Sequence, residues 1–341
     1  MARASPIPLA LTMGDACGIG PEIIASLFRS PESAGCVVVG DVGVMRRAAA
    51  LRGGLLVVAH IESAADAAHA PGNCIPVLQV EGLSTELLAL PMGQVDARAG
   101  AAAAACIRAA VRLAHQGEIA AIVTAPIHKE ALAAAGVSFP GHTEMLQALA
   151  WPGQAPQPVR MMLANEELRT VLVTIHMSLR EAINAVTFDA VLQTIVIAHR
   201  AAAGWGQPRP RIAVAGLNPH AGEGGLFGDE EIRIIGPAVR AARSQGIDAH
   251  GPFAPDTVFM RARHSPGHTG EFDIVVAMTH DHGLIPVKYL GVEQGVNVTL
   301  GLPFVRTSPD HGTAFDIAGQ GIADGSSLLA AVRMARRLAA A

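Results

Sequence analysis

Short apolar runs bounded by turn residues alternate with helix-like segments along most of the chain. The runs are Leu9–Met13, Val37–Val39, Ile119–Val123, Arg169–Ile175, Arg211–Ala215, Asp273–Met278 and Val296–Leu300. Runs of this length and composition predict strands. Their alternation with helices predicts βαβ units and a mostly parallel sheet, so the fold class is α/β.

Several helix boundaries can be read from the same pattern. Pro21 and Glu22 follow Gly20 as a first turn, and strong helix formers fill Ala97–His115 before Gly117. Further helices are predicted from the capping-box spacing of Ser178 and Glu181, from the acids Asp229, Glu230 and Glu231, and across Ser326–Ala340.

Length and composition refine this picture. A chain of 341 residues exceeds the size of one ordinary core, so we expect two lobes around a cleft. Half of the residues are hydrophobic but only 4% are aromatic, so the core must consist of Ala, Val, Ile and Leu. No internal repeat is visible.

Charge and patterning exclude several classes of partner. The net charge of -4 and the absence of a Lys/Arg run argue against a nucleic-acid surface. No apolar stretch approaches the ~20 residues of a transmembrane helix, and the N-terminus lacks the pattern of a signal peptide, so we expect a cytoplasmic protein without a membrane partner. The dispersed Cys17, Cys36, Cys74 and Cys106 fit reduced thiols.

Three histidines follow strand-like runs. His176 comes after Val171–Ile175, and His220 ends the string Gly-Leu-Asn-Pro-His. His280 follows the apolar run Val275–Met278 and Thr279. Taken singly, each is more often structural than a ligand. Three strand ends of one sheet can nevertheless converge on one ion, and their common placement favours an open metal site.

Other polar residues are candidates for holding a substrate. Asp281 and Asp256 can orient a ligand or a hydroxyl, with a turn or helix cap as the alternative. Lys288, Asn297 and Arg306 follow at regular spacing; the two cations suit a carboxylate or phosphate, with solvated surface cations as the alternative.

Two glycine-containing segments also suggest ligand contacts. In Gly141-His142-Thr143-Glu144, backbone N–H groups at a helix start can face an anion, although a simple N-cap explains Thr143 almost as well. The segment Gly14–Glu22 lies between a strand and a helix but lacks the GxGxxG spacing, so an ordinary Rossmann site is not assigned.

Together these strings resemble the 4-hydroxythreonine-4-phosphate dehydrogenase family, nearly end to end. They are Met13–Glu22, Ala125–Lys129, Gly141–Glu144, Gly216–Glu223, His280–Asp281 and Gly301–Gly312. The resemblance implies an α/β/α subunit of the isocitrate/isopropylmalate dehydrogenase type with a non-Rossmann cofactor cleft. Its lobes are expected at residues 1–129 with 310–341, and at 130–309. It also implies a homodimer with the active site at the subunit interface.

The resemblance assigns roles to matching positions. His176, His220 and His280 match metal ligands of a site shared between subunits. The positions that match substrate-binding residues are His142, Thr143, Lys288, Asn297 and Arg306, while Asp256 and Asp281 match the acidic catalytic positions. The sequence departs from the family pattern at Ala16-Cys17, Thr279 and His282.

The activity implied is metal-dependent oxidation of 4-phosphooxy-L-threonine by NAD or NADP, with decarboxylation, in pyridoxal phosphate biosynthesis. Three imidazoles favour zinc, while magnesium, manganese and cobalt stay open. Alternative substrates within the family are D-threonate or D-erythronate 4-phosphate and a carboxylated aromatic cis-dihydrodiol. Outside it, a metallohydrolase and a non-catalytic metabolite-binding protein are the competing hypotheses.

Overall fold

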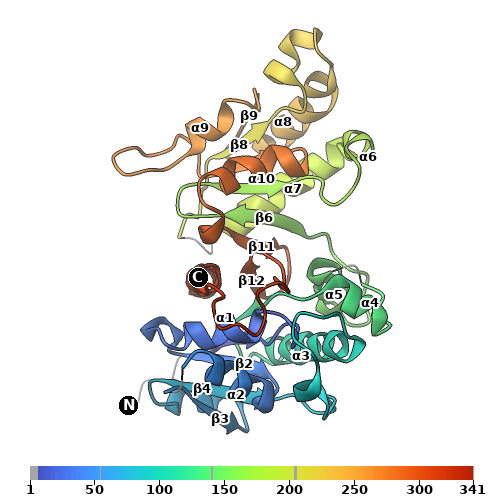
Figure 1. The fold of residues 1–341 in the computed structure, drawn as a ribbon. Coiled ribbons are helices and arrows are strands. Elements are labelled where there is room, and N and C mark those ends of the chain that lie inside the picture. The colour runs from blue at the N-terminus through green and yellow to red at the C-terminus, as the bar shows by residue number, and fades with distance from the viewer. Residues whose placement is uncertain (1–6, 54, 140, 203–205, 341) are drawn as a thin grey trace. The chain divides into compact units, whose positions relative to one another are not determined.

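The structure, a computed structural model, describes residues 7–53, 55–139, 141–202 and 206–340 (Figure 1). The chain forms two compact units. Unit 1 contains residues up to Gln157 together with Leu302–Ala339, and unit 2 contains Pro158–Gly301 and the last residues from Ala340. Segments from both ends of the sequence therefore form unit 1, whereas nearly all of unit 2 comes from one continuous stretch.

Unit 1 is a parallel α/β sandwich. Its strands run in the order β3-β4-β2-β1-β5-β12, and all of their pairings are parallel. The strands are β1 (Leu9–Thr12), β2 (Cys36–Gly40), β3 (Val57–Ile61), β4 (Cys74–Gln79), β5 (Ala121–Thr124) and β12 (Val305–Pro309). β1, β2 and β5 are fully buried apolar runs, as strands covered on both faces must be.

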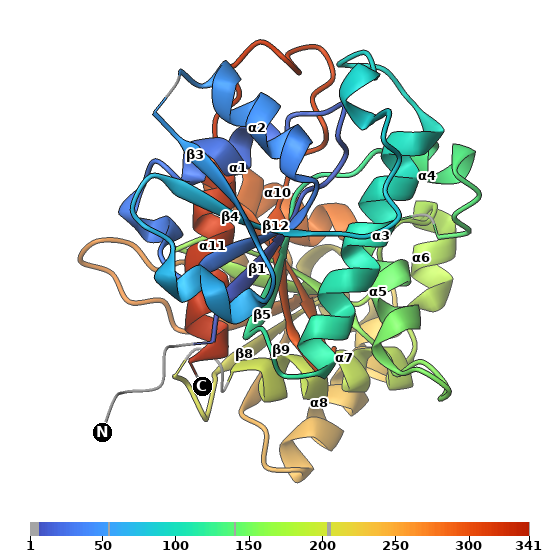
Figure 2. The same cartoon turned by 90° about the horizontal axis from the view of Figure 1, so that it is seen from below.

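Helices cover both faces of this sheet. On one side lie α3 (Ala97–His115), α4 (Lys129–Ala134) and α5 (His142–Ala150); on the other lie α1 (Gly20–Leu27), α2 (Val42–Leu51) and α11 (Ser326–Ala339) (Figure 2). Small residues fill the inner side of α3, including Gly100, where an added Cβ would lie 2.1 Å from the Ala131 carbonyl oxygen. The backbones of α3 and α4 therefore meet at this glycine.

Unit 2 has a mixed sheet in the order β11-β6-β7-β10-β8-β9. The strands are β6 (Arg160–Ala164), β7 (Arg169–Leu172), β8 (Ile212–Ala215), β9 (Ala249–Phe253), β10 (Ile274–Ala277) and β11 (Val296–Leu300). β7, β10, β8 and β9 run parallel, while β6 is antiparallel to both of its neighbours. The carboxyl ends of the four parallel strands consequently meet at one edge.

The helices of unit 2 also lie on both faces of its sheet. They are α6 (Leu179–Ala185), α7 (Phe188–Ala202), α8 (Gly236–Ser244), α9 (Val258–Ala262) and α10 (His280–Tyr289). Phe259 of α9 and Leu284 of α10 pack in one apolar cluster with Val275 and Ala277 of β10. This packing fixes α10 immediately beyond the carboxyl end of β10.

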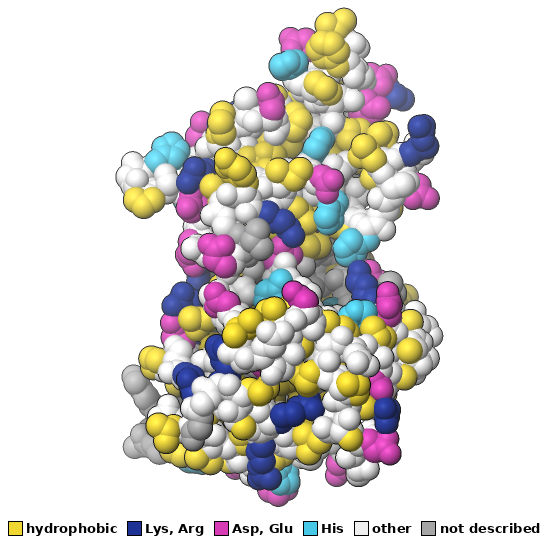
Figure 3. All heavy atoms as spheres, in the orientation of Figure 1, with side chains coloured by type: hydrophobic (Ala, Val, Ile, Leu, Met, Phe, Trp, Pro, Cys, Tyr) yellow, Lys and Arg dark blue, Asp and Glu magenta, His cyan; other side chains and the backbone are white. Residues whose placement is uncertain are grey.

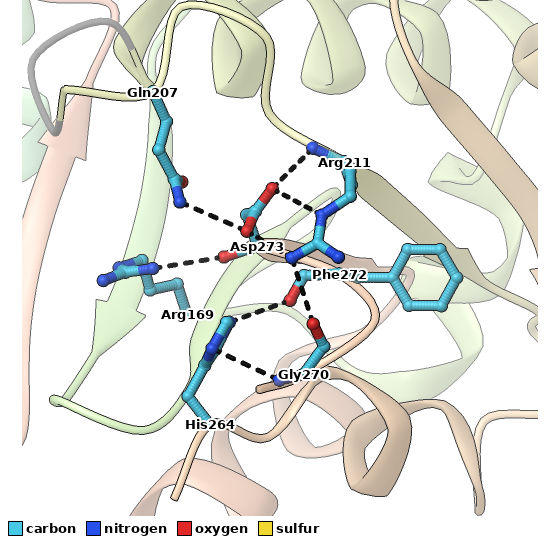
Figure 4. Close-up of polar contacts among 7 residues, drawn as sticks. All are labelled: Arg169, Gln207, Arg211, His264, Gly270, Phe272 and Asp273. Carbon is cyan, nitrogen blue, oxygen red and sulfur yellow. Dashed lines mark hydrogen bonds and ion pairs between the residues drawn. The ribbon is translucent and has the colours of Figure 1, made fainter. Parts of the chain in front are cut away.

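A polar network anchors the opposite, amino-terminal edge of β10 (Figure 4). The buried carboxylate of Asp273 accepts hydrogen bonds from the Arg211 backbone N–H (2.8 Å) and guanidinium (2.9 and 3.2 Å), and from the Gln207 amide (3.2 Å). Nearby, His264 accepts from the Gly270 N–H and bonds the Phe272 carbonyl oxygen. We assign these contacts a structural role, because the candidate histidines lie beyond the other end of the strands.

The fold class predicted from the sequence is confirmed, and each predicted apolar run contains a strand. The lobe boundaries differ, however. Residues 130–157 and 302–309 belong to unit 1, because α4 and α5 pack on α3, and β12 pairs with β5. All four cysteines are buried free thiols. Among the described residues, no single helix has both the length and the apolarity to cross a bilayer; only the bent pair α6–α7 meets these criteria jointly.

Candidate active site

Candidate metal ligands lie at the carboxyl edge of unit 2. His176 follows β7, His280 follows β10 and His220 follows β8, and these three strands are parallel neighbours in the sheet. The sequence-based expectation that the histidines share one sheet edge is therefore met. Ligand sites in open α/β sheets are characteristically found at this edge.

His176 and His280 lie side by side. Their ring centroids are 5.8 Å apart, and they line a cavity of about 290 Å³ with Thr174, Leu179, Asp281 and His282. The His280 Nδ1 lies 2.7 Å from a carboxylate oxygen of Asp281. Because a carboxylate only accepts, a neutral His280 donates from Nδ1 and keeps its Nε2 lone pair for a ligand. Asp281 thus orients the His280 imidazole, as carboxylates do for metal-binding histidines.

His220 is held in an unusual backbone conformation. It begins a run of five left-handed residues, from His220 (φ 52°) to Gly224 (φ 67°), within the turn Pro219–Gly225. The non-glycine members of this run, including His220 itself, each cost roughly 1–2 kcal/mol relative to a right-handed backbone. His176 also has a positive φ, of 39°. Such strain clusters at functional sites, so both positions support a ligand role.

The chain alone does not bring three ligands together. Among the described residues, no group of three His, Cys, Asp or Glu side chains is close enough to hold an ion. The pair His176–His280 is formed within the subunit, whereas His220 is exposed on its own turn. The described residues of one chain therefore do not form the predicted three-histidine site.

The remaining candidates in unit 2 are spread along its elements. Asp256 is exposed in the turn between β9 and α9, beyond the same carboxyl edge of the sheet. Lys288 lies in the last turn of α10, just over two turns beyond His280. Asn297 is in β11, and its Oδ1 is buried with no hydrogen-bond partner among the described residues. An unsatisfied buried oxygen of this kind is suited to a ligand donor.

Unit 1 contains a buried cationic corner of its own. Arg306 of β12 is only 3% exposed, and its Nη2 donates a 2.7 Å hydrogen bond to the Thr124 hydroxyl at the end of β5. Burial lowers the pKa of Arg306 to about 10, so the guanidinium stays charged at neutral pH. An anionic group bound here would offset the cost of burying this charge.

His142 lies in the same electrostatic environment, in the first turn of α5 with Thr143. The Nε2 atom of His142 is buried and has no partner among the described residues, although the ring as a whole is partly accessible. Burial, reinforced by the positive charge of Arg306, holds the pKa of His142 well below its usual value. The ring is therefore neutral and can accept or donate a hydrogen bond.

We expect His142 to make the protein sensitive to acid. Because its folded-state pKa is depressed, the unfolded chain takes up a proton near pH ~6.5 that the folded chain does not. The free energy of unfolding should thus fall as the pH drops below that value, by at most about 1.4 kcal/mol per pH unit for this group. Urea unfolding at about pH 7.5 and about pH 5.5 should show a smaller pH effect in His142→Gln.

The matched control is His69→Gln, which replaces an exposed histidine of the same unit. This control should keep the pH dependence of the wild type. An unchanged pH dependence in His142→Gln would contradict the depressed pKa of His142 and hence its neutral state.

The Gly14–Glu22 loop is part of the framework of unit 1. Gly14 has φ 75°, and a Cβ there would lie 2.5 Å from the Pro126 carbonyl oxygen. Asp15 accepts the Cys17 N–H at 2.8 Å, and the Glu22 carboxylate accepts two backbone N–H groups of the 319–321 segment. Close packing therefore accounts for these residues without a dinucleotide loop.

Sequence reasoning missed two residues that shape the site. Thr124, the partner of Arg306, ends an ordinary apolar strand and carries no local signal. Glu231 was read as one of the acids at a helix start, but its buried carboxylate instead accepts the backbone N–H groups of Leu217 and Asn218. A string of acids gives no indication that one of them turns inward.

Comparison with known proteins identifies the family of the chain. The family model "Pyridoxal phosphate biosynthetic protein PdxA" matches residues 32–335. A 4-hydroxythreonine-4-phosphate dehydrogenase from Beijerinckia indica subsp. indica is 59% identical over 97% of this chain and 95% of the relative. A D-threonate 4-phosphate dehydrogenase from Pectobacterium atrosepticum is 46% identical, covering 97% and 99% of the two chains.

A solved structure of similar sequence has the same fold. The 4-hydroxythreonine-4-phosphate dehydrogenase from Klebsiella pneumoniae superimposes with a TM-score of 0.87 at 45% identity, covering 97% of this chain and 99% of that one. The range that the family model matches, residues 32–335, includes parts of both units and all candidate site positions. The chain therefore belongs to the PdxA family of pyridoxal phosphate biosynthetic proteins.

Proposed function

We propose that the chain is a metal-dependent, NAD- or NADP-linked dehydrogenase that oxidises 4-phosphooxy-L-threonine and promotes loss of its carboxyl group. The observation that carries the proposal is the buried Arg306 guanidinium beside the Thr124 hydroxyl, which suits a phosphate group. The dehydrogenase names of the relatives, whose substrates are phosphorylated, support the same reading.

The His176–His280 pair fits a divalent ion, with zinc favoured by the imidazole donors. Two adjacent rings, a carboxylate that fixes one of them, and strained backbone at His176 are all consistent with ligation. A bound divalent ion lowers the pKa of a substrate hydroxyl beside it. The nicotinamide cofactor supplies the hydride acceptor.

The third ligand comes, in this proposal, from a second subunit. His220 is exposed, and its turn carries the exposed apolar side chains Leu226 (73%) and Phe227. Beside His176, Leu179 is 66% exposed. Figure 3 shows histidine and hydrophobic side chains next to one another on the surface of unit 2. Apolar surface around incomplete ligand sets favours a homodimer in which one subunit's His220 completes its partner's pair.

The roles of the remaining residues follow from their chemistry. In unit 1, Arg306, Thr124 and the first turn of α5 suit a phosphate group, and in unit 2, Lys288 and Asn297 suit a carboxylate or an amino group. Asp281 keeps the His280 ring oriented, while Asp256 positions the hydroxyl that is oxidised. Oxidation at this carbon gives a β-keto acid, which readily loses carbon dioxide.

A substrate panel tests the proposal. The protein is stripped of metal, reloaded with zinc, magnesium, manganese or cobalt, and mixed with NAD or NADP while the absorbance of the reduced nicotinamide is followed. The panel contains 4-phosphooxy-L-threonine, the 4-phosphates of D-threonate and D-erythronate, and a carboxylated aromatic cis-dihydrodiol. We expect metal-dependent turnover with the highest kcat/KM for 4-phosphooxy-L-threonine.

The panel also distinguishes the alternatives. Higher kcat/KM for D-threonate 4-phosphate, the substrate in the name of one relative, would move the chain to a catabolic role. Metal-dependent consumption of a substrate without nicotinamide would indicate a metallohydrolase. Binding without any turnover would indicate a metabolite-binding protein.

A further inference from the structure

The carboxylate of Glu231 is buried against the turn that carries His220. Its side chain is only 4% exposed. One oxygen, Oε1, accepts the backbone N–H groups of Leu217 (2.7 Å) and Asn218 (2.8 Å), and the other, Oε2, accepts the Asn218 side-chain amide (3.0 Å). Three donors from the residues just before His220 thus converge on one buried charge.

The backbone closes around this carboxylate from two sides. A Cβ added to Gly216 would lie 3.0 Å from Oε1, and one added to Gly222 would lie 2.8 Å from Oε2. A side chain at Gly216 would be tight against the carboxylate, and one at Gly222 would be too close to it and would also face the unfavourable φ of 79°. Glu231 therefore contacts the strained turn both before and after His220.

The conformation of this turn has to be imposed by its surroundings. Its left-handed residues from His220 to Gly224 are unfavourable for L-amino acids, so they persist only where surrounding contacts impose them. Backbone hydrogen bonds of the turn include those from Ala221 N–H to the Asn218 carbonyl oxygen, from Phe227 N–H to the Gly222 carbonyl oxygen and from Leu226 N–H to the Glu223 carbonyl oxygen. The first two involve Asn218 and Gly222, the residues that Glu231 contacts.

The backbone at Glu231 and the charge of its side chain are also unusual. Glu231 opens a π-helical turn, Glu231–Ile235, that precedes α8. Such turns recur at functional sites. Hydrogen bonding from Asn218 and Leu217 outweighs the opposing effect of burial and keeps the pKa of Glu231 below its usual value, so the group is ionised at neutral pH.

We infer that Glu231 is a positioning residue for His220: its carboxylate holds the left-handed turn in the conformation that presents the imidazole to the metal. The inference rests on the proposed role of His220 as a metal ligand. Glu231 itself touches neither metal nor substrate in this scheme. It acts on the geometry, and hence on the affinity, of the ligand set.

The test is a titration of the metal-free protein with Co²⁺, read from the cobalt absorption spectrum rather than from turnover. Glu231→Gln keeps the shape of the side chain but replaces an acceptor by an amide donor that faces other donors. We expect the affinity for Co²⁺ to fall on the order of 10- to 100-fold, as for other residues that orient ligands. In a His220→Ala background, Glu231→Gln should cause no further loss.

Asp273→Asn is the matched control. Asp273 is also a buried carboxylate of unit 2 that accepts a backbone N–H, but it lies at the amino-terminal edge of β10 (Figure 4). Its replacement should lower the thermal stability while leaving the Co²⁺ affinity unchanged. Should Glu231→Gln fail to fold, Asn218→Ala keeps the two backbone N–H bonds to the Glu231 carboxylate, removes the side-chain bonds to Glu231 and Glu230, and should weaken Co²⁺ binding several-fold.

The outcomes separate the inference from the function on which it rests. If His220→Ala binds Co²⁺ as tightly as the wild type, the proposed ligand role of His220 is wrong. If His220→Ala weakens binding but Glu231→Gln and Asn218→Ala do not, His220 is a ligand and the positioning role of Glu231 is wrong. An equal loss of Co²⁺ affinity in Asp273→Asn would show that Glu231 affects metal binding only through the stability of the fold, and the positioning role would be wrong.

Discussion

Mixing a His176→Ala subunit with a His220→Ala subunit should restore turnover that neither variant shows alone. In the proposed dimer, each site combines the His176–His280 pair of one subunit with His220 of the other. A mixed dimer then has one site with both substitutions and one intact site. With random exchange at equal concentrations half of the dimers are mixed, so about a quarter of the wild-type activity is expected.

The matched control is a mixture of His176→Ala with His280→Ala. These residues form a pair within one subunit, so every site in the mixed dimer carries one substitution and no activity should return. Subunit exchange is verified with differently tagged chains. Mixed dimers that form but stay inactive in the His176/His220 mixture would contradict a shared site and favour self-contained subunits.

Arg306→Ala should lower kcat/KM for the phosphorylated substrate by roughly 100- to 1,000-fold. Arg306 is buried and already oriented by Thr124, so the phosphate meets a planar, desolvated donor. Removing one partner of such a buried charged contact costs about 2–5 kcal/mol. Arg306→Lys keeps the charge but loses the two-pronged geometry, so its loss should be smaller. Steady-state kinetics of both variants measure the difference.

Thermal unfolding of both variants checks that the fold persists, and the dephosphorylated substrate is the control ligand. The wild type should strongly prefer the phosphorylated form, whereas Arg306→Ala should lose most of this preference. A wild-type preference for an unphosphorylated dihydrodiol, together with a negligible effect of Arg306→Ala on phosphates, would reject the proposed substrate. The chain would then be a catabolic dehydrogenase of the same family.

The strands that could be predicted from the sequence are those whose own residues form an apolar run. The runs that form β1, β7, β8 and β10 are apolar because both faces of these strands are buried. β3 and β9 escaped prediction because they are edge strands: Val57 is exposed, and β9 contains Gly251 and Pro252. β12 was missed because its buried positions are largely polar, as in Arg306-Thr-Ser.

The candidate site divides in the same way. Histidines directly after apolar strands could be predicted to share one edge, since parallel strands end together. The Thr124–Arg306 contact could not, because it depends on the pairing of β5 with β12 across 182 positions of sequence. The left-handed turn at His220 and its support by Glu231 are equally non-local: nothing in the string Asp229-Glu-Glu231 distinguishes the inward acid from its neighbours.

The chain path through unit 1 bears on how the protein is made. β12 and α11 come from the last 40 or so residues, yet β12 pairs with β5 and α11 packs against both strands. While the ribosome is still producing unit 2, β5 has no neighbour on this side, and its unpaired edge and apolar face remain uncovered. Unit 2, a continuous stretch, can finish folding first. The N-terminal part of unit 1 is thus exposed to aggregation until the end of synthesis. Only then does β12, which carries Arg306, pair with β5 and cover this edge.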